Sequence, residues 1–214
     1  MSQALETILR TGVVAVLRAE SPEKLINVAH ALSKGGVEAI EVTMTVPGAL
    51  DVIREACGEM AGVAVIGAGT VLDAHTARLA ILAGAQYIVA PTVNLDVIRT
   101  AKRYSKVVCP GALTPTEILG AWEAGADIVK VFPASIVGPA YFKALKGPLP
   151  QIRLMPTGGV SVENAAAFIE AGACAVAAGG KLVDRQAIAQ GNWDAITDTA
   201  REMIQEVNKG RGEA

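Results

Sequence analysis

The sequence predicts an α/β protein: a compact (β/α)8 TIM barrel with a short N-terminal helix, forming one domain over residues 1–214. The first observation is a repeated junction, in which a glycine precedes a short β-rich run. It occurs in GGVEAIEVT, AGAQYIVAP, AGADIVKVFP and AGACAVAAGG, which begin at residues 35, 83, 124 and 171. Glycine commonly ends a helix, so each phrase marks the change from a helix to a buried strand. Successive junctions are roughly forty residues apart or slightly more. This distance accommodates two βα units, each a strand and a helix joined by short loops.

The second observation is the number of β-rich runs between these junctions. No pair of neighbouring runs carries an antiparallel hairpin signal, so the strands are expected to be parallel. In chain order, the eight predicted strands are residues 13–17, 38–43, 63–67, 86–90, 106–109, 127–132, 152–157 and 174–179.

Helical patterns fill the intervals between the runs. Ser21 before Pro22, and Asp73 after the GAGTVL turn, are suitable helix N-caps. An open doubly wound sheet is the alternative, but it usually has fewer strands and a glycine-rich turn after the first strand, where this chain has RAESPE. In chain order, the eight predicted helices are residues 22–34, 47–57, 73–83, 94–104, 115–124, 139–146, 162–171 and 193–208.

Composition limits the classes of function. The chain has 51% hydrophobic and 19% charged residues, a net charge of −2 and only 4% aromatic residues, so we expect a sizeable core and no nucleic-acid partner. Its apolar runs are too short to span a membrane, and charged residues near the start argue against a signal peptide. Three cysteines without paired spacing suggest a reducing compartment. We therefore expect a cytoplasmic protein.

Two charged residues lie inside apolar strands. On the sixth predicted strand, Lys130 alternates with Val129 and Val131, and on the second, Glu41 alternates with Ile40 and Val42. A barrel strand directs its aliphatic residues outward to the helices, so Lys130 and Glu41 are predicted to point inward. Strands two and six lie opposite each other in a ring of eight, so the two side chains can approach near the axis.

An inward lysine and glutamate have two interpretations. A structural ion pair contributes little stability, because desolvation can exceed the Coulombic gain. The alternative is an amine nucleophile with a carboxylate that moves protons, which works best when Glu41 acts through a water or lies near the nitrogen without touching it. The geometry favours the catalytic pair.

Polar and glycine residues follow several strands. Thr70 follows the third, Thr157 with Gly158 and Gly159 ends the seventh, and Gly179 with Gly180 ends the eighth. Glycine turns after strands seven and eight match the phosphate site of such barrels. Arg18, directly after strand one, adds a cation to the same rim or is a solvated surface residue.

These motifs occur together in one known family. EVT with Glu41, GAGTV with Thr70, VKVFPAS with Lys130, KGPLPQIRLMPTGGV and GGKLV resemble the 2-keto-3-deoxy-6-phosphogluconate aldolases, some of which also cleave 4-hydroxy-2-oxoglutarate. The resemblance covers the whole chain. It implies a metal-free, cofactor-free class I lyase of the Entner–Doudoroff pathway that forms pyruvate, and a homotrimer of barrels. It also implies that Lys130 forms the Schiff base and Glu41 is the general acid/base.

The resemblance further implies that Thr70 binds the pyruvate carboxylate, and that Thr157, Gly158 and Gly159 bind substrate and phosphate. Two positions depart from the common pattern. Thr45 stands where many members have a carboxylate-binding arginine, and Gly180 stands where relatives often have a phosphate-binding serine. Arg18 or Lys181 is expected to supply the missing charge. These departures leave open a preference for the phosphogalactonate analogue or for a non-phosphorylated 2-keto acid.

Three other classes of function fit the sequence less well. A metal-dependent aldolase or epimerase would need clustered ligands, but the only histidines, His30 and His75, fall in predicted helices. A phosphosugar isomerase without a Schiff base would keep the glycine turns but leave the inward Lys130–Glu41 pair unexplained. A non-enzymatic scaffold would act through an exposed apolar patch.

Overall fold

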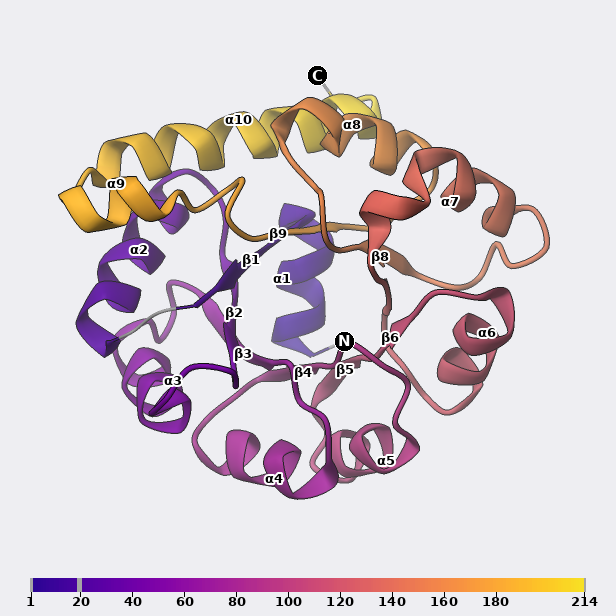
Figure 1. The fold of residues 1–214 in the computed structure, drawn as a ribbon, viewed down its shortest axis with the longest axis horizontal. Helices are drawn as coiled ribbons and strands as arrows, with labels where there is room; N and C mark the ends of the chain where they lie inside the picture. Colours follow the sequence, from indigo (N-terminus) through magenta and orange to yellow (C-terminus); the bar gives the residue numbers. More distant parts are fainter. Residues whose placement is uncertain (1, 19–20, 214) are drawn as a thin grey trace.

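The strands form a closed ring that is surrounded by helices (Figure 1). The computed structural model describes residues 2–18 and 21–213. One parallel sheet has the order β5-β4-β3-β2-β1-β9 and a second the order β6-β7-β8. A bridge between Thr157 and Ala177 joins the second sheet to β9, and the Lys130 amide donates to the Pro110 carbonyl on the other side. The ring is therefore continuous, which confirms the predicted barrel.

Each predicted strand overlaps an observed one. The third lies two residues later than predicted, because it continues through glycines that pair with β2 rather than forming a turn. The fifth barrel strand is divided into β5 and β6, because Pro110 has no N–H to donate to a neighbour. The observed strands are β1 (Val13–Leu17), β2 (Ala39–Thr43), β3 (Val65–Gly69), β4 (Tyr87–Val89), β5 (Val107–Cys109), β6 (Gly111–Ala112), β7 (Val129–Val131), β8 (Leu154–Pro156) and β9 (Val176–Ala178).

The eight predicted helices are present, and both predicted caps are confirmed. Ser21 Oγ accepts the Lys24 amide, and the Asp73 carboxylate accepts the Thr76 amide. The short segments η1 and α9 were not predicted, because so few residues give no clear periodicity. The observed helices are α1 (Gln3–Thr11), α2 (Pro22–Lys34), α3 (Ala49–Glu59), α4 (Ala74–Leu82), α5 (Leu95–Arg103), α6 (Pro115–Glu123), η1 (Ala134–Ile136), α7 (Gly138–Lys146), α8 (Val162–Glu170), α9 (Arg185–Gln190) and α10 (Trp193–Arg211).

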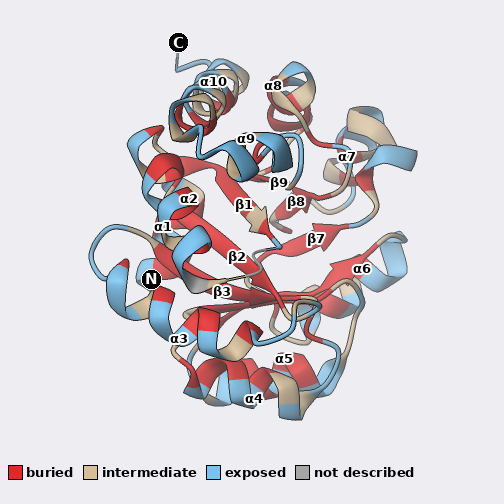
Figure 2. Ribbon diagram, turned by 60° about the vertical axis from the view of Figure 1, so that its left-hand side comes forward, coloured by how far each residue is buried: buried red, intermediate tan, exposed pale blue. Residues whose placement is uncertain are grey.

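The buried apolar residues form two layers that follow the strand alternation. Ile40, Val42, Val129 and Val131 belong to the outer layer between strands and helices, as predicted. The inner layer fills the barrel. It includes Ala39, on the opposite face of β2, and Ile128, the residue directly before β7. Figure 2 shows the strands buried at the centre and the exposed residues on the outer helix surfaces.

The N-terminal helix closes one end of the barrel. In Figure 1, α1 lies across the middle of the ring, and its Ala4, Leu5 and Ile8 pack with the inner layer. The strands begin at this end, so their carboxyl ends open at the other, where barrels of this kind carry their chemistry. Among the described helices, none combines the length and apolar character needed to cross a membrane.

Candidate active site

Glu41 and Lys130 are both buried inside the barrel, with only 1% and 5% of each residue's surface exposed. Glu41 pairs in register with Val16 and Gly67 on the neighbouring strands, and Lys130 with Gly111 and Met155. The flanking aliphatic residues of both strands point to the outer layer, so the two charged side chains share the interior, as predicted.

The two groups interact without a direct ion pair. Among the described residues no salt bridge joins them, and Glu41 Oε2 has no hydrogen-bond partner. Burial raises the pKa of Glu41, while the charges of Lys130 and then Arg18 oppose the rise. The Lys130 Nζ lies 5.0 Å from the centroid of the Phe132 ring. The interior thus holds a lysine nitrogen beside an aromatic face and a carboxyl with one oxygen that has no hydrogen-bond partner.

A glycine makes room for the Glu41 carboxyl group. A Cβ on Gly69 would lie 1.8 Å from Glu41 Oε1, so a larger residue at Gly69 would displace the carboxyl. The next residue, Thr70, is partly buried and has a φ of 57°. A β-branched residue rarely adopts this left-handed conformation, which marks Thr70 as a strained position beside Glu41.

Arg18 lies on the rim next to two predicted site elements. It is exposed and follows β1 directly. A Cβ on Gly179 would lie 3.6 Å from the carbonyl oxygen of Val16, two residues before Arg18. The end of β1 therefore lies beside the turn after β9, and the charge of Arg18 is close enough to Glu41 to oppose the rise that burial causes in its pKa. Thr45 is also exposed, and its Oγ1 lies 2.9 Å from Thr43 Oγ1.

The turn after β8 is shaped by two glycines in left-handed conformations. Gly158 and Gly159 have φ values of 89° and 77°, and a Cβ on Gly159 would lie 2.6 Å from that of Ser135. Only glycine suits such a position without strain. Thr157 precedes them, buried, with an unpartnered Oγ1.

The turn after β9 is more open. Gly180 is exposed, and a Cβ there would meet no atom within 4 Å. The neighbouring Lys181 is exposed as well, and its charge contributes to lowering the pKa of Glu163, after the hydrogen bonds from Ser161 and the Glu163 amide. Lys181 therefore lies near the start of α8, and both glycine turns border one rim.

Three residues near the predicted site were not singled out from the sequence as functional. Phe132 lies beside Lys130, Thr43 lies buried above Glu41 on β2, and Tyr87 is fully buried on β4. Strand alternation could have identified all three as inward-facing residues. Each lies on the inward face of its strand, together with a residue of the site or of the inner layer.

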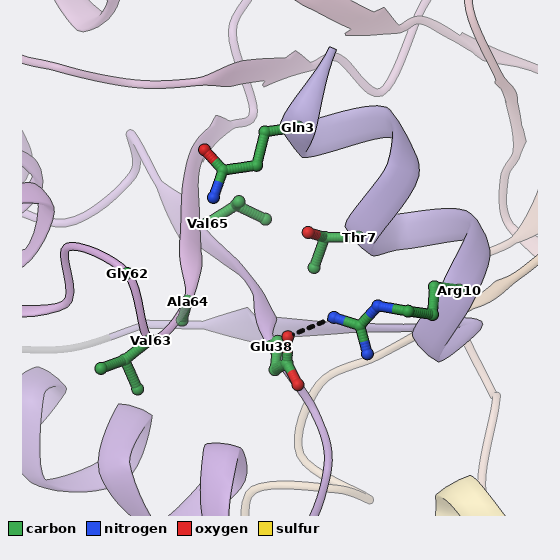
Figure 3. A pocket seen from close by; sticks show the side chains of 8 residues that line it. All are labelled: Gln3, Thr7, Arg10, Glu38, Gly62, Val63, Ala64 and Val65. Atoms are coloured by element: carbon green, nitrogen blue, oxygen red, sulfur yellow. Dashed lines mark hydrogen bonds and ion pairs between the residues drawn. The ribbon is translucent and has the colours of Figure 1, made fainter. Parts of the chain in front are cut away.

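A cavity of about 110 Å³ occurs at the opposite end of the barrel. Figure 3 shows it between α1 and the starts of β2 and β3, where Arg10 and Glu38 form an ion pair. It belongs to the closed end, away from Glu41 and Lys130. No three His, Cys, Asp or Glu side chains in residues 2–18 and 21–213 are grouped so that they could hold a metal ion.

Comparisons with known proteins show the family to which this fold and sequence are similar. A family model described as KDPG and KHG aldolase matches residues 5–199. The 2-dehydro-3-deoxy-6-phosphogalactonate aldolase of Escherichia coli K12 is 38% identical over 79% of this chain and 83% of its own length. The KHG/KDPG aldolase of the same organism is 34% identical over 94% of each chain. A solved KDPG aldolase of Legionella pneumophila, with pyruvate captured as a covalent carbinolamine, has a TM-score of 0.87 at 25% identity and covers 94% of this chain and 98% of its own.

Proposed function

The chain belongs to the KDPG and KHG aldolase family of lyases, and on this basis we propose that it cleaves 2-keto-3-deoxy-6-phosphogluconate to pyruvate and glyceraldehyde 3-phosphate. The observation that carries the proposal is the buried Lys130, which shares the barrel interior with Glu41 but forms no ion pair with it. A buried pair without direct contact is poorly explained as a stabilising salt bridge. It suits an amine nucleophile and a nearby proton carrier.

Lys130 supplies the covalent step. Its neutral amine adds to the C2 carbonyl of the substrate. The carbinolamine then takes up one proton, delivered by Glu41 through a water, and loses its hydroxyl as water, which leaves a protonated imine on Lys130 and an ionised Glu41. This cation accepts the electron pair of the C3–C4 bond when Glu41, through a water, removes the proton of the C4 hydroxyl. The aldehyde leaves, the enamine is protonated at C3, and water releases pyruvate from Lys130.

The surrounding residues bind the substrate's two charged ends. Thr70 and Thr157 bind the carboxylate of the pyruvate half, and the backbone amides of Gly158, Gly159, Gly179 and Gly180 bind the phosphate. The partly buried Thr70 and the unpartnered Oγ1 of Thr157 support this assignment. The exposed Thr45 lies at the edge of the same rim and carries no charge.

A second candidate substrate is the C4 epimer, 2-keto-3-deoxy-6-phosphogalactonate. It is favoured by the 38% identity to an aldolase named for that substrate. A third, 4-hydroxy-2-oxoglutarate, lacks phosphate and is favoured by the open Gly180, which offers no side-chain donor.

The reaction needs no cofactor, because the imine nitrogen itself accepts the electrons of the breaking bond. The proposed partner is therefore a small 2-keto acid. Three free cysteines, Cys57, Cys109 and Cys174, suit a reducing cytoplasm, where we place the enzyme.

Two measurements test this function. Borohydride reduction in the presence of pyruvate should leave a stable adduct on Lys130, which neither a phosphosugar isomerase nor a scaffold protein would form. The kcat/KM values for the three candidate substrates then rank them. Absence of any pyruvate adduct in the unmodified enzyme would refute the Schiff-base mechanism.

Arg18→Ala is expected to raise KM and to lower kcat/KM by roughly 10- to 1000-fold, the effect of losing a charge-assisted contact. A guanidinium can bind a carboxylate or phosphate through two hydrogen bonds, and Thr45 cannot replace it. Steady-state kinetics of Arg18→Ala measure the loss, and Thr45→Arg in that background should restore part of it. Arg99→Ala, on the exposed surface of α5, is the control. Values for Arg18→Ala within about twofold of the parent would point to Lys181 instead.

We further propose that three chains assemble through the surface of α4. Leu79 and Leu82 on this helix, with Leu72 before it and Leu95 on the adjacent α5, are large exposed apolar residues. Water-exposed leucines grouped on neighbouring helices are typical of a covered interface. The homotrimer expected from the family resemblance would bury them.

Leu82→Glu should dissociate this assembly, because it places a charge in the apolar contact. Light scattering after size exclusion should give three times the 22.0 kDa chain mass for the parent and a single chain for the variant. Val63→Glu, an exposed apolar residue beside the cavity of Figure 3, should leave the mass unchanged. A monomeric parent would contradict the proposal.

A further inference from the structure

Tyr87 carries a polar group that the proposed chemistry has not yet used. Its side chain is fully buried in the inner layer of the barrel, and its hydroxyl has no hydrogen-bond partner. A buried tyrosine hydroxyl usually finds a partner, because leaving it unpaired costs the full desolvation of the group. A phenylalanine would fill the same space without this cost.

The strand register directs this hydroxyl toward Glu41. Tyr87 on β4 pairs with Gly67 on β3, which pairs with Glu41 on β2. A Cβ on Gly67 would lie 2.4 Å from both Cε2 and Cζ of Tyr87, so the phenol ring crosses over Gly67. The hydroxyl is bonded to Cζ, at the end of the ring farthest from β4. It therefore extends beyond β3 on the side of β2.

The Glu41 carboxyl lies one step further along the same path. It occupies the space over Gly69, two residues beyond Gly67 on the same face of β3. Its Oε2 is also buried and unpartnered. Two glycines on one strand thus make room for two polar groups, one above the other, and each group lacks a hydrogen bond.

We propose that Tyr87 is a positioning residue for Glu41. The Tyr87 hydroxyl donates a hydrogen bond, through a buried water, to the Glu41 carboxylate. The inference rests on the proposed role of Glu41 in proton transfer. The bond satisfies both buried groups. It also holds the carboxylate in one orientation and favours its ionised form, which is the form that accepts a proton.

The other titratable groups around Glu41 are consistent with a donor role for Tyr87. Burial, then Glu41 and Cys109, raise the pKa of Tyr87, so it stays protonated. Burial likewise raises the pKa of Cys109 on β5, with smaller increases from Asp127, Cys174 and Glu41, so it stays neutral. Lys130 on β7 and Arg18 after β1 are the cations that act on Glu41. The hydroxyl of Tyr87 is thus the neutral donor directed at this carboxyl.

Tyr87→Phe tests the proposal by removing one oxygen atom. The readout is the rate of solvent exchange at the pyruvate methyl group, divided by the amount of imine trapped with borohydride, as a function of pH. Protonation of Glu41 should make the exchange rate fall at low pH, and this fall is the acid limb of the pH profile. Losing a donor to the carboxylate raises the pKa of Glu41, so the acid limb should move to higher pH by about 0.5–1 unit. Below the limb, the rate should fall roughly 3- to 10-fold, with pyruvate trapping and KM unchanged.

Tyr104→Phe is the matched control, because Tyr104 caps α5 outside the barrel. In a Glu41→Gln background, Tyr87→Phe should cause no further loss, since it acts through that carboxyl. An acid limb that stays within about 0.2 pH units of the parent, or a further loss in the double variant, would overturn the positioning role. If the parent itself traps no pyruvate, the proposed function fails instead, so the two failures are distinguishable.

Discussion

Lys130→Ala should abolish both substrate cleavage and the borohydride-trapped pyruvate adduct. The Lys130 amine is buried at the end of the barrel interior where the predicted substrate-binding residues converge. Ile128 and Phe132, two residues away on either side, offer no amine. Loss of a covalent nucleophile typically reduces turnover by several orders of magnitude. Mass spectrometry of the intact protein after reduction measures the adduct, and a coupled pyruvate assay measures cleavage.

The fold should survive this substitution. Alanine removes a buried cation together with its aliphatic chain, so the lost packing is offset by the desolvation that the charge no longer incurs. Circular dichroism and thermal unfolding check this. Lys143→Ala, an exposed lysine on α7, is the matched control and should keep both adduct and activity. An undiminished adduct in Lys130→Ala would assign the Schiff base to another residue.

The sequence was sufficient to predict the inward pair because strand alternation is a strong constraint. The aliphatic neighbours of the two charged residues are most stable when buried in the apolar layer between strands and helices. They are Val129 and Val131 beside Lys130, and Ile40 and Val42 beside Glu41. Once those residues face outward, the charged residue between them must face inward. Once the repeated junctions and the number of strands indicate a barrel, the inward direction of both charges follows from local alternation, without knowledge of which strands are neighbours.

Relations between strands were not predictable in the same way. The sequence predicts Gly67 as the last residue of a strand and Gly69 as part of the turn after it. In the fold both are strand residues, and they accommodate Tyr87 and Glu41. Their role depends on the register of three strands and on two rotamers, which tertiary packing decides. The position of the Phe132 ring beside Lys130 depends on packing in the same way.

Glu41→Gln should separate imine formation from proton transfer. Glutamine keeps the shape of the side chain but cannot carry a proton between substrate and water. Exchange at the pyruvate methyl group should therefore fall by roughly 10²- to 10⁴-fold, the usual contribution of a positioned acid/base group. Pyruvate trapping at Lys130 should persist at least in part, because the amine remains in place. Glu38→Gln, just before the same strand at the closed end of the barrel, is the matched control and should exchange normally.

The pH dependence of proton exchange tests whether Glu41 is the group that titrates. Burial raises the pKa of Glu41, against the opposing charges of Lys130 and Arg18, so proton exchange by the parent should fall as the pH decreases through a value above that of an ordinary glutamate. In Arg18→Ala the loss of one opposing cation should raise that pKa further and move the limb to higher pH. In Glu41→Gln the residual exchange should lose this limb, because the group that produced it is absent. If the limb persists unchanged in Glu41→Gln, the proton is carried by a different residue, and the buried carboxyl of Glu41 has only a structural role.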